Sequence, residues 1–231
     1  MVKKKNTKDV TEERLEAVEE ALTRTERVLE KHQKNILTGI SVIIIIVLGY
    51  FAFQKYYLEP KEKDASEQMW MAEKYFGMDS LQLALDGDGN YYGFIDIIDE
   101  YGVTKSANLA NYYAGICYLR LGQYEDAIDY LGDFSSDDQI LAPMALGAIG
   151  DAYMELGETS KAASYYLDAA NKEDNAFTAP VFIQKAAWAY ELEENYSKAL
   201  QLQNRLKKDF ANTAEGRDAE KYIALLEAKL K

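Results

Sequence analysis

The chain has 231 residues, of which 26 are basic and 39 acidic, and its formal net charge at neutral pH is −13. So acidic a chain is a poor partner for nucleic acid, because binding a phosphate backbone depends on clustered positive charge. There is one histidine and one cysteine, Cys117, so an intramolecular disulfide is excluded and cysteine usage does not indicate a redox compartment.

Residues 1–34 form a tail that carries most of an apolar seam, at alternating steps of three and four from Leu15 to Ile36, which predicts a helix. The seam consists of Leu15, Val18, Leu22, Thr25, Leu29, His32 and Ile36. A short coiled coil would join two copies of the chain or dock on a partner at the membrane face. The other interpretation, which the short length and the two polar seam positions favour, is a solvated amphipathic helix near the lipid. No cysteine or second histidine lies near His32, so we interpret it as a seam residue and not as a metal ligand.

Residues 35–54 form an uninterrupted run of 20 uncharged residues. As a helix rising about 1.5 Å per residue, such a run covers roughly 30 Å, the thickness of a bilayer hydrocarbon core. A cleaved signal peptide would start closer to the chain start, and a core helix of a small soluble domain is rarely apolar on all sides. We therefore predict one transmembrane helix over residues 35–55, with an aromatic belt at its end. The belt comprises Tyr50, Phe51, Phe53, Tyr56 and Tyr57.

The charges that flank this run barely decide its orientation, because four basic residues lie close to it on each side. The short tail, residues 1–34, carries nine basic and eight acidic residues, and long C-terminal domains are translocated largely regardless of charge. These points favour a cytoplasmic N-terminus. The rest of the chain holds 17 basic and 31 acidic residues, which would keep it off anionic lipid headgroups.

The pattern of residues 60–85 predicts a helix leaving the membrane, with Pro60 in its first turn. Residues 86–90, with the sequence DGDGN, resemble the opening of a calcium-binding loop. The sixth position of that loop is Tyr91 where glycine is required, and the twelfth is Ile97 where glutamate is required. We therefore interpret this segment as a plain turn.

A periodic pattern follows and decides the expected fold. A small residue and a tyrosine recur at intervals of 35 and 37 residues, in Gly115-x2-Tyr118, Gly150-x2-Tyr153 and Ala187-x2-Tyr190. An alanine stands twelve positions after each small residue, at Ala127, Ala162 and Ala199. Small residues on two successive helices let their backbones approach closely, so each unit is a helix hairpin. One hairpin cannot bury its apolar face alone, so the hairpins must stack into a solenoid.

The expected fold is all-α: an N-terminal helix, a single transmembrane helix and an α-solenoid of helix hairpins. Residues 56–107 hold the exit helix and a degenerate first unit, with Ala72-x2-Tyr75 in its first helix and Gly93-x3-Ile97 in its second. Residues 108–211 hold three repeats, and residues 212–231 form a capping helix.

The repeats resemble the tetratricopeptide repeat, whose small-x2-Tyr pair, turn glycine and later alanine match over residues 108–214. The chain departs from this pattern in three ways, one of which is that the terminal proline of the repeat comes late. Asn111, Leu146 and Ile183 replace the consensus tryptophan of the first helices, and Glu194 replaces the turn glycine of the third unit. The resemblance implies a protein-binding domain.

No nucleophile motif, phosphate loop or histidine follows the apolar run, so we expect neither an enzyme nor a cofactor or metal site. A solenoid instead offers a concave groove lined by the first helix of each hairpin. Residues of the groove, or alternatively of the core between repeats, are Leu109, Tyr112, Ile116, Leu119, Met144, Asp151, Met154, Gln184 and Trp188. Their apolar, aromatic and methionine character favours apolar or mildly basic polypeptide segments as partners.

The layout of tail, span and acidic repeats is similar to that of the ancillary SecYEG translocon subunit family of bacterial envelope proteins. That resemblance implies a protein of the inner membrane with a periplasmic repeat domain. It also implies contacts with translocon subunits, periplasmic chaperones and exported polypeptides. Two other classes stay open: a scaffold that organises an envelope complex without binding clients, and a docking adaptor whose inverted topology leaves the repeats in the cytoplasm.

Overall fold

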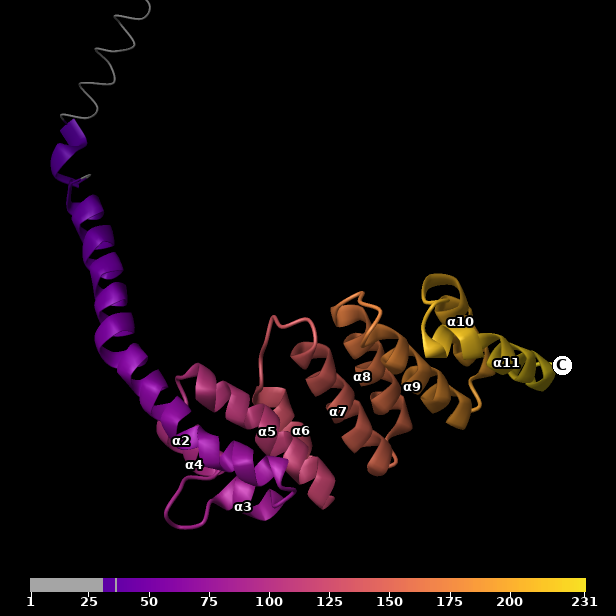
Figure 1. The fold of residues 1–231 in the computed structure, drawn as a ribbon. Coiled ribbons are helices and arrows are strands. Elements are labelled where there is room, and N and C mark those ends of the chain that lie inside the picture. Colours follow the sequence, from indigo (N-terminus) through magenta and orange to yellow (C-terminus); the bar gives the residue numbers. More distant parts are fainter. Residues whose placement is uncertain (1–30, 36) are drawn as a thin grey trace, which may run out of the picture. The chain divides into compact units, whose positions relative to one another are not determined.

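The computed structural model describes residues 31–35 and 37–231, and its contacts divide the chain into two units, Met1–Tyr57 and Leu58–Lys231. Every regular element among the described residues is helical. A long apolar helix and a series of helix hairpins are both present (Figure 1). The expected all-α fold with a solenoid of hairpins is therefore confirmed.

In the first unit, residues 37–53 are α-helical and the π-helix η1 (Gln54–Leu58) follows. The large apolar side chains of the α-helical segment are exposed; Ile45, for example, is 68% exposed. Among the described residues one helix, Lys31–Gly77, is long and apolar enough to cross a membrane, with a mean hydropathy of 2.6 over its most apolar window. The expected tail seam over residues 15–29 lies outside the described residues.

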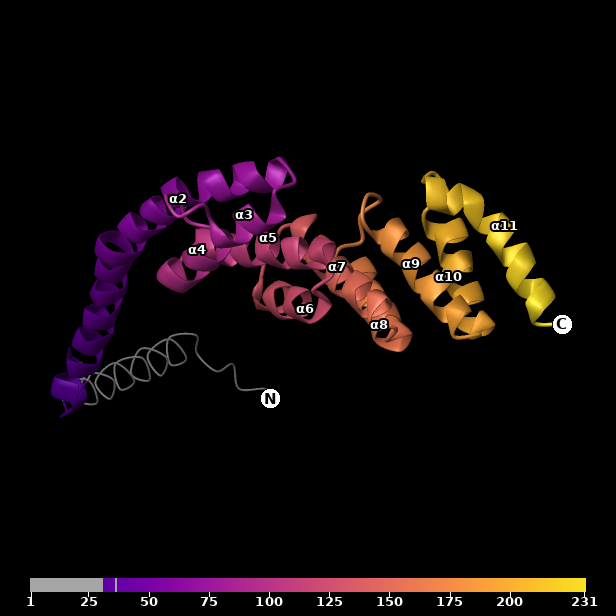
Figure 2. The same cartoon turned by 90° about the horizontal axis from the view of Figure 1, so that it is seen from below.

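The second unit is built from helices α2 to α11. Their bounds are α2 (Glu59–Gly77), α3 (Leu81–Asp86), α4 (Phe94–Tyr101), α5 (Lys105–Leu121), α6 (Tyr124–Asp133), α7 (Leu141–Glu155), α8 (Thr159–Lys172), α9 (Ala179–Leu192), α10 (Tyr196–Asp209) and α11 (Ala214–Lys229). The hairpins α5/α6, α7/α8 and α9/α10 follow one another in chain order (Figures 1 and 2). Each first helix contacts the next, so α2, α5, α7, α9 and α11 form one row.

The same turn closes all three hairpins. A residue in the left-handed conformation ends the first helix, and the next residue donates its N–H to the carbonyl of the repeat tyrosine. These bonds join Gln123 to Tyr118, Glu158 to Tyr153 and Asn195 to Tyr190, at 2.8–2.9 Å. The left-handed residues are Gly122, Gly157 and Glu194, with φ of 78°, 75° and 57°. Glutamate thus occupies the third turn in the strained conformation that glycine adopts freely.

The degenerate unit shows the same turn at the end of α2. Asp79 is left-handed (φ 62°), and the Ser80 N–H donates to the Tyr75 carbonyl at 2.9 Å. The N–H of Ala84 then bonds the Ser80 carbonyl, as that of Ala127 bonds Gln123. Ala84, in α3, therefore takes the place of the repeat alanine.

Two expectations for this region are wrong. The helix expected over residues 60–85 ends at Gly77, because the left-handed turn interrupts it. Gly93 lies outside the second helix and is the N-cap of α4. The interval from Tyr75 to Tyr118 is 43 residues, eight more than from Tyr118 to Tyr153, and the extra residues divide the second helix into α3 and α4.

The segment between α3 and α4 is held by a single carboxylate. Asp88 accepts the backbone N–H groups of Asn90 and Tyr91 and the hydroxyl of Tyr75, each at 2.9 Å. The two backbone bonds, followed by the tyrosine bond, hold the pKa of Asp88 below its usual value. This is the Asx-type turn that the composition of the segment favours.

The small residues of the repeat pattern lie where helices approach most closely. A Cβ atom added to Gly150 would lie 2.6 Å from Tyr166 Cε1, and one added to Gly115 would lie 2.5 Å from Leu131 Cγ. Ala127 and Ala162, the alanines of the facing helices, are fully buried. The hairpin core therefore has no room for larger side chains at these positions.

We expect Glu194→Gly to stabilise the fold by about 1 kcal/mol, because it removes a side chain from a left-handed backbone. Gly157→Ala is the matched reverse change. Nothing lies within 4 Å of the added Cβ, so only the backbone cost, again about 1 kcal/mol, should appear. Urea denaturation of the full chain in detergent micelles, followed by circular dichroism, measures both. Destabilisation by Glu194→Gly would show that the glutamate side chain has a structural role.

Candidate functional site

Two adjoining clefts open along the row of first helices. The first cleft has a volume of about 480 Å³ and lies where α5, α7 and α9 meet. The second, of about 240 Å³, lies between α9 and α11. Lys185 and Trp188 line both clefts, so they adjoin on α9. We call the two clefts together the groove, and its main lining residues are Leu119, Tyr124, Asp151, Met154, Glu155, Val181, Gln184, Lys185, Trp188, Glu215, Asp218 and Tyr222.

Five of the nine residues expected in a groove line it, namely Leu119, Asp151, Met154, Gln184 and Trp188. The other four lie elsewhere. Met144 on α7 is 40% exposed but lines neither cleft, whereas three residues of α5 are half-buried against the core. These three are Leu109, Tyr112 and Ile116. The packing of these three residues fits the alternative interpretation, in which they belong to the core between repeats.

A polar cluster forms the centre of the first cleft. Both oxygens of Asp151, on α7, accept from the Lys185 ammonium of α9, at 2.7 and 2.8 Å. The hydroxyl of Tyr166, on α8, donates to Asp151 Oδ1 at 2.6 Å. The carboxylate thus links three helices with bonds inside the chain. It organises the floor of the groove and is not a free ligand group.

Burial, followed by the hydrogen bond to Asp151, raises the pKa of the Tyr166 hydroxyl well above its usual value. The neutral phenol is therefore the form that the fold stabilises. The Lys185 ammonium lies over the Tyr166 ring, 5.5 Å from its centroid, a favourable arrangement for a cation and an aromatic face.

The remaining lining of the groove is mainly apolar or acidic. Trp188 is 46% exposed and meets the Tyr222 ring edge-on at a centroid distance of 6.5 Å. Glu155, Glu215 and Asp218 also line the clefts. Among the lining residues Lys185 is the one basic side chain, and it is paired with Asp151. The groove therefore suits apolar side chains accompanied by positive charge.

Sequence reasoning missed the contributions of Val181, Lys185 and the capping helix. Steps of three, one and three along α9 separate Val181, Gln184, Lys185 and Trp188, and this spacing places them on one face of the helix. That spacing could have identified the α9 residues. Tyr222 and Asp218 could not be found this way, because their position depends on how α11 packs against α9.

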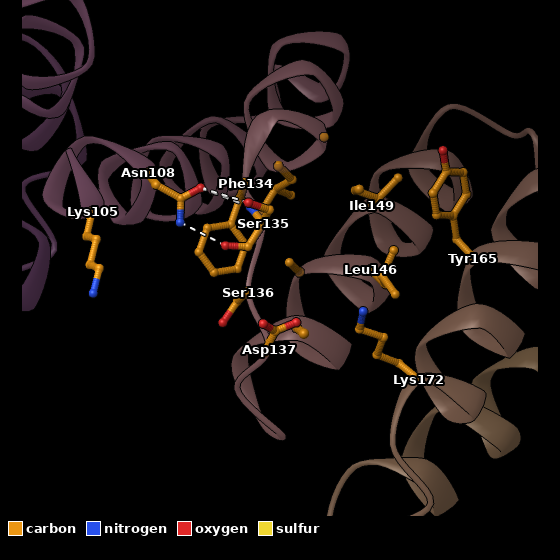
Figure 3. Close-up of a pocket in the computed structure, with 14 residues that line it drawn as sticks. Lys105, Asn108, Phe134, Ser135, Ser136, Asp137, Leu146, Ile149, Tyr165 and Lys172 are labelled. Carbon is orange, nitrogen blue, oxygen red and sulfur yellow. Dashed lines mark hydrogen bonds between the residues drawn. The ribbon is translucent and has the colours of Figure 1, made fainter. Parts of the chain in front are cut away.

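A larger cavity, of about 880 Å³, lies where the first and second hairpins meet (Figure 3). Its apolar lining includes Leu146 and Ile149. Asn108 fixes the loop at its edge, since its amide donates to the Ser135 carbonyl at 2.9 Å and its oxygen accepts the Ser135 N–H at 3.0 Å. The amide is thus used by the loop itself, and the lining combines the basic Lys105 and Lys172 with the acidic Asp137 and the aromatic Phe134 and Tyr165.

Comparison with protein families finds one match: the tetratricopeptide repeat, over residues 109–137. The matched segment runs from α5 through α6 into the loop that follows. No curated protein matches the chain. The match and the stacked hairpins together support a tetratricopeptide repeat protein, whose repeats form a non-catalytic, protein-interaction fold.

We expect Tyr166→Phe to cost about 1 kcal/mol at pH 7, because a buried hydrogen bond is lost. The variant should also lose less stability as the pH rises above about 10, the ordinary pKa of tyrosine. The pKa is raised in the folded state, so above pH 10 the unfolded chain releases this proton first and stability falls. Urea midpoints measured from pH 7 to 11 give both effects. Equal alkaline slopes in the variant and the parent chain would contradict this assignment.

Proposed function

We propose that the chain is a single-pass membrane protein whose repeat domain binds polypeptide segments in the groove, next to the bilayer. The observation that carries the proposal is the groove itself: exposed Trp188 together with acidic lining residues, on the first-helix row of a protein-interaction fold. Apolar segments with lysine or arginine nearby are the ligands that such a surface suits.

The proposed anchor is the helix over residues 35–55. Its apolar side chains are exposed to their surroundings in the structure, and burying them in lipid removes that apolar area from water. We place the N-terminus in the cytoplasm and the repeat domain on the outer side of a bacterial inner membrane. Support for this orientation comes from the nine lysine and arginine residues of the short tail and from the length of the C-terminal domain.

The proposed anchor would hold the groove beside a membrane. A binding site held near a translocation channel meets emerging segments at a high effective concentration, so modest affinity for each segment suffices. The resemblance of the whole layout to the ancillary SecYEG translocon subunit family supports assistance to protein export as the role. Translocon subunits, periplasmic chaperones and exported polypeptides are the partners that we propose.

The groove predicts where partners touch the chain. A photo-crosslinking amino acid placed at Trp188 in living cells should capture translocon subunits or exported polypeptides, because this side chain lines both clefts. Leu225 is the matched control, since it is 52% exposed on α11 and lines neither cleft. Equal capture from both positions, or capture of neither class of partner, would reject the groove as the export site.

The proposed topology predicts the result of proteolysis in spheroplasts. Protease added outside should degrade the repeat domain and leave the N-terminal tail protected, as shown by tags at the two ends. A fully protected repeat domain would place it in the cytoplasm and favour the docking adaptor instead.

A further inference from the structure

Gln184 is a buried amide with nothing to bind. Its side chain, on α9, is 5% exposed, and neither its Oε1 nor its Nε2 has a hydrogen-bond partner in the described part of the chain. The same residue lines the second cleft, between α9 and α11. An unpaired donor and an unpaired acceptor therefore belong to a residue that lines an open cleft.

Such a group destabilises the free protein, because water is lost from the amide without a replacement partner. A side chain of the same size without polar atoms would pack there at lower cost. Buried polar groups that lack partners are rare in folded proteins, and a ligand group is one way to satisfy them.

We propose that Gln184 binds the main chain of one residue of a polypeptide lying in the second cleft. Its Nε2 donates to a peptide carbonyl and its Oε1 accepts a peptide N–H. The main chain of each residue offers one N–H donor and one carbonyl acceptor, and the carboxamide supplies the complement of each. The inference rests on the proposed function, since it names the part of the polypeptide that this portion of the groove recognises.

The neighbours of Gln184 disfavour free ions as its ligands. Glu215 and Asp218 line the same cleft, so an anion would meet repulsion. A cation would satisfy Oε1 and leave the Nε2 donor unpaired. The N–H and carbonyl of one extended residue satisfy both atoms, with an apolar side chain beside Trp188 and Tyr222 and a basic one beside the two carboxylates.

The test uses the full chain in lipid nanodiscs and a fluorescein-labelled decapeptide of leucine, lysine and glycine, with binding followed by anisotropy. Gln184→Met should weaken binding about a hundredfold, the equivalent of two hydrogen bonds worth about tenfold each. The same change should raise the melting temperature, because it removes the unpaired amide. A residue that is merely structural would instead lower the melting temperature when it is replaced.

Gln203→Met is the matched control. Gln203, on α10, is 1% exposed and its Oε1 is also unpaired, but it lines neither cleft of the groove. The Gln203→Met substitution should leave peptide affinity unchanged.

Peptides with one amide replaced by an ester test the same bond from the ligand side, since an ester lacks the N–H. An ester at one position should weaken binding to the parent chain about tenfold and should leave binding to the Gln184→Met variant unchanged. Full affinity of Gln184→Met, with a lower melting temperature, would show that Gln184 is satisfied within the free protein and would overturn the inference.

Trp188→Ala separates this inference from the proposed function. Peptide binding that depends on Trp188 and is insensitive to Gln184 would retain the groove and reject the main-chain contact. An absence of peptide binding to the parent chain would reject both.

Discussion

The close approach of paired helices at small residues is the constraint on which the rest of this structure depends. Gly115 and Gly150 leave space for Leu131 and Tyr166, and no β-carbon fits in either place. That contact sets the distance between the helices of a hairpin. Because each hairpin has a small residue at this position and the same left-handed turn, successive hairpins stack with their first helices in one row.

The row of first helices in turn produces the groove. Tyr166, which fills the space at Gly150, is also the side chain that donates to Asp151, so core packing and groove polarity share a residue. Lys185 completes the link by bridging from α9. The polar groups of the first cleft are thereby satisfied inside the chain, whereas Gln184 in the second cleft is not. The two clefts therefore differ in chemistry: the polar groups of the first are hydrogen-bonded to one another, and the Gln184 amide of the second has no partner among the described residues.

The degenerate first unit shows how an insertion is tolerated in such an array. Its turn, its tyrosine and its alanine keep the repeat register, and the eight extra residues are accommodated by splitting the second helix into α3 and α4. The Asp88 turn closes the gap with bonds to backbone and to Tyr75. The repeat contacts at the start of the unit are therefore unaffected by the interruption that follows them.

The amino-acid sequence by itself determined the class of fold. Periodic small residues, turn glycines and one long apolar run are local patterns, and each predicts a local structure that the helices and turns here display. It also predicted that Leu119, Met154 and Trp188 lie together, since the repeat register places them on first helices. Only the tertiary structure decided that Tyr112 packs into the core, that Ala84 continues the register across an insertion, and that α11 adds Tyr222 to the groove. The physical reason is that burial depends on which helix covers a face, and a repeat pattern specifies the face without specifying its cover.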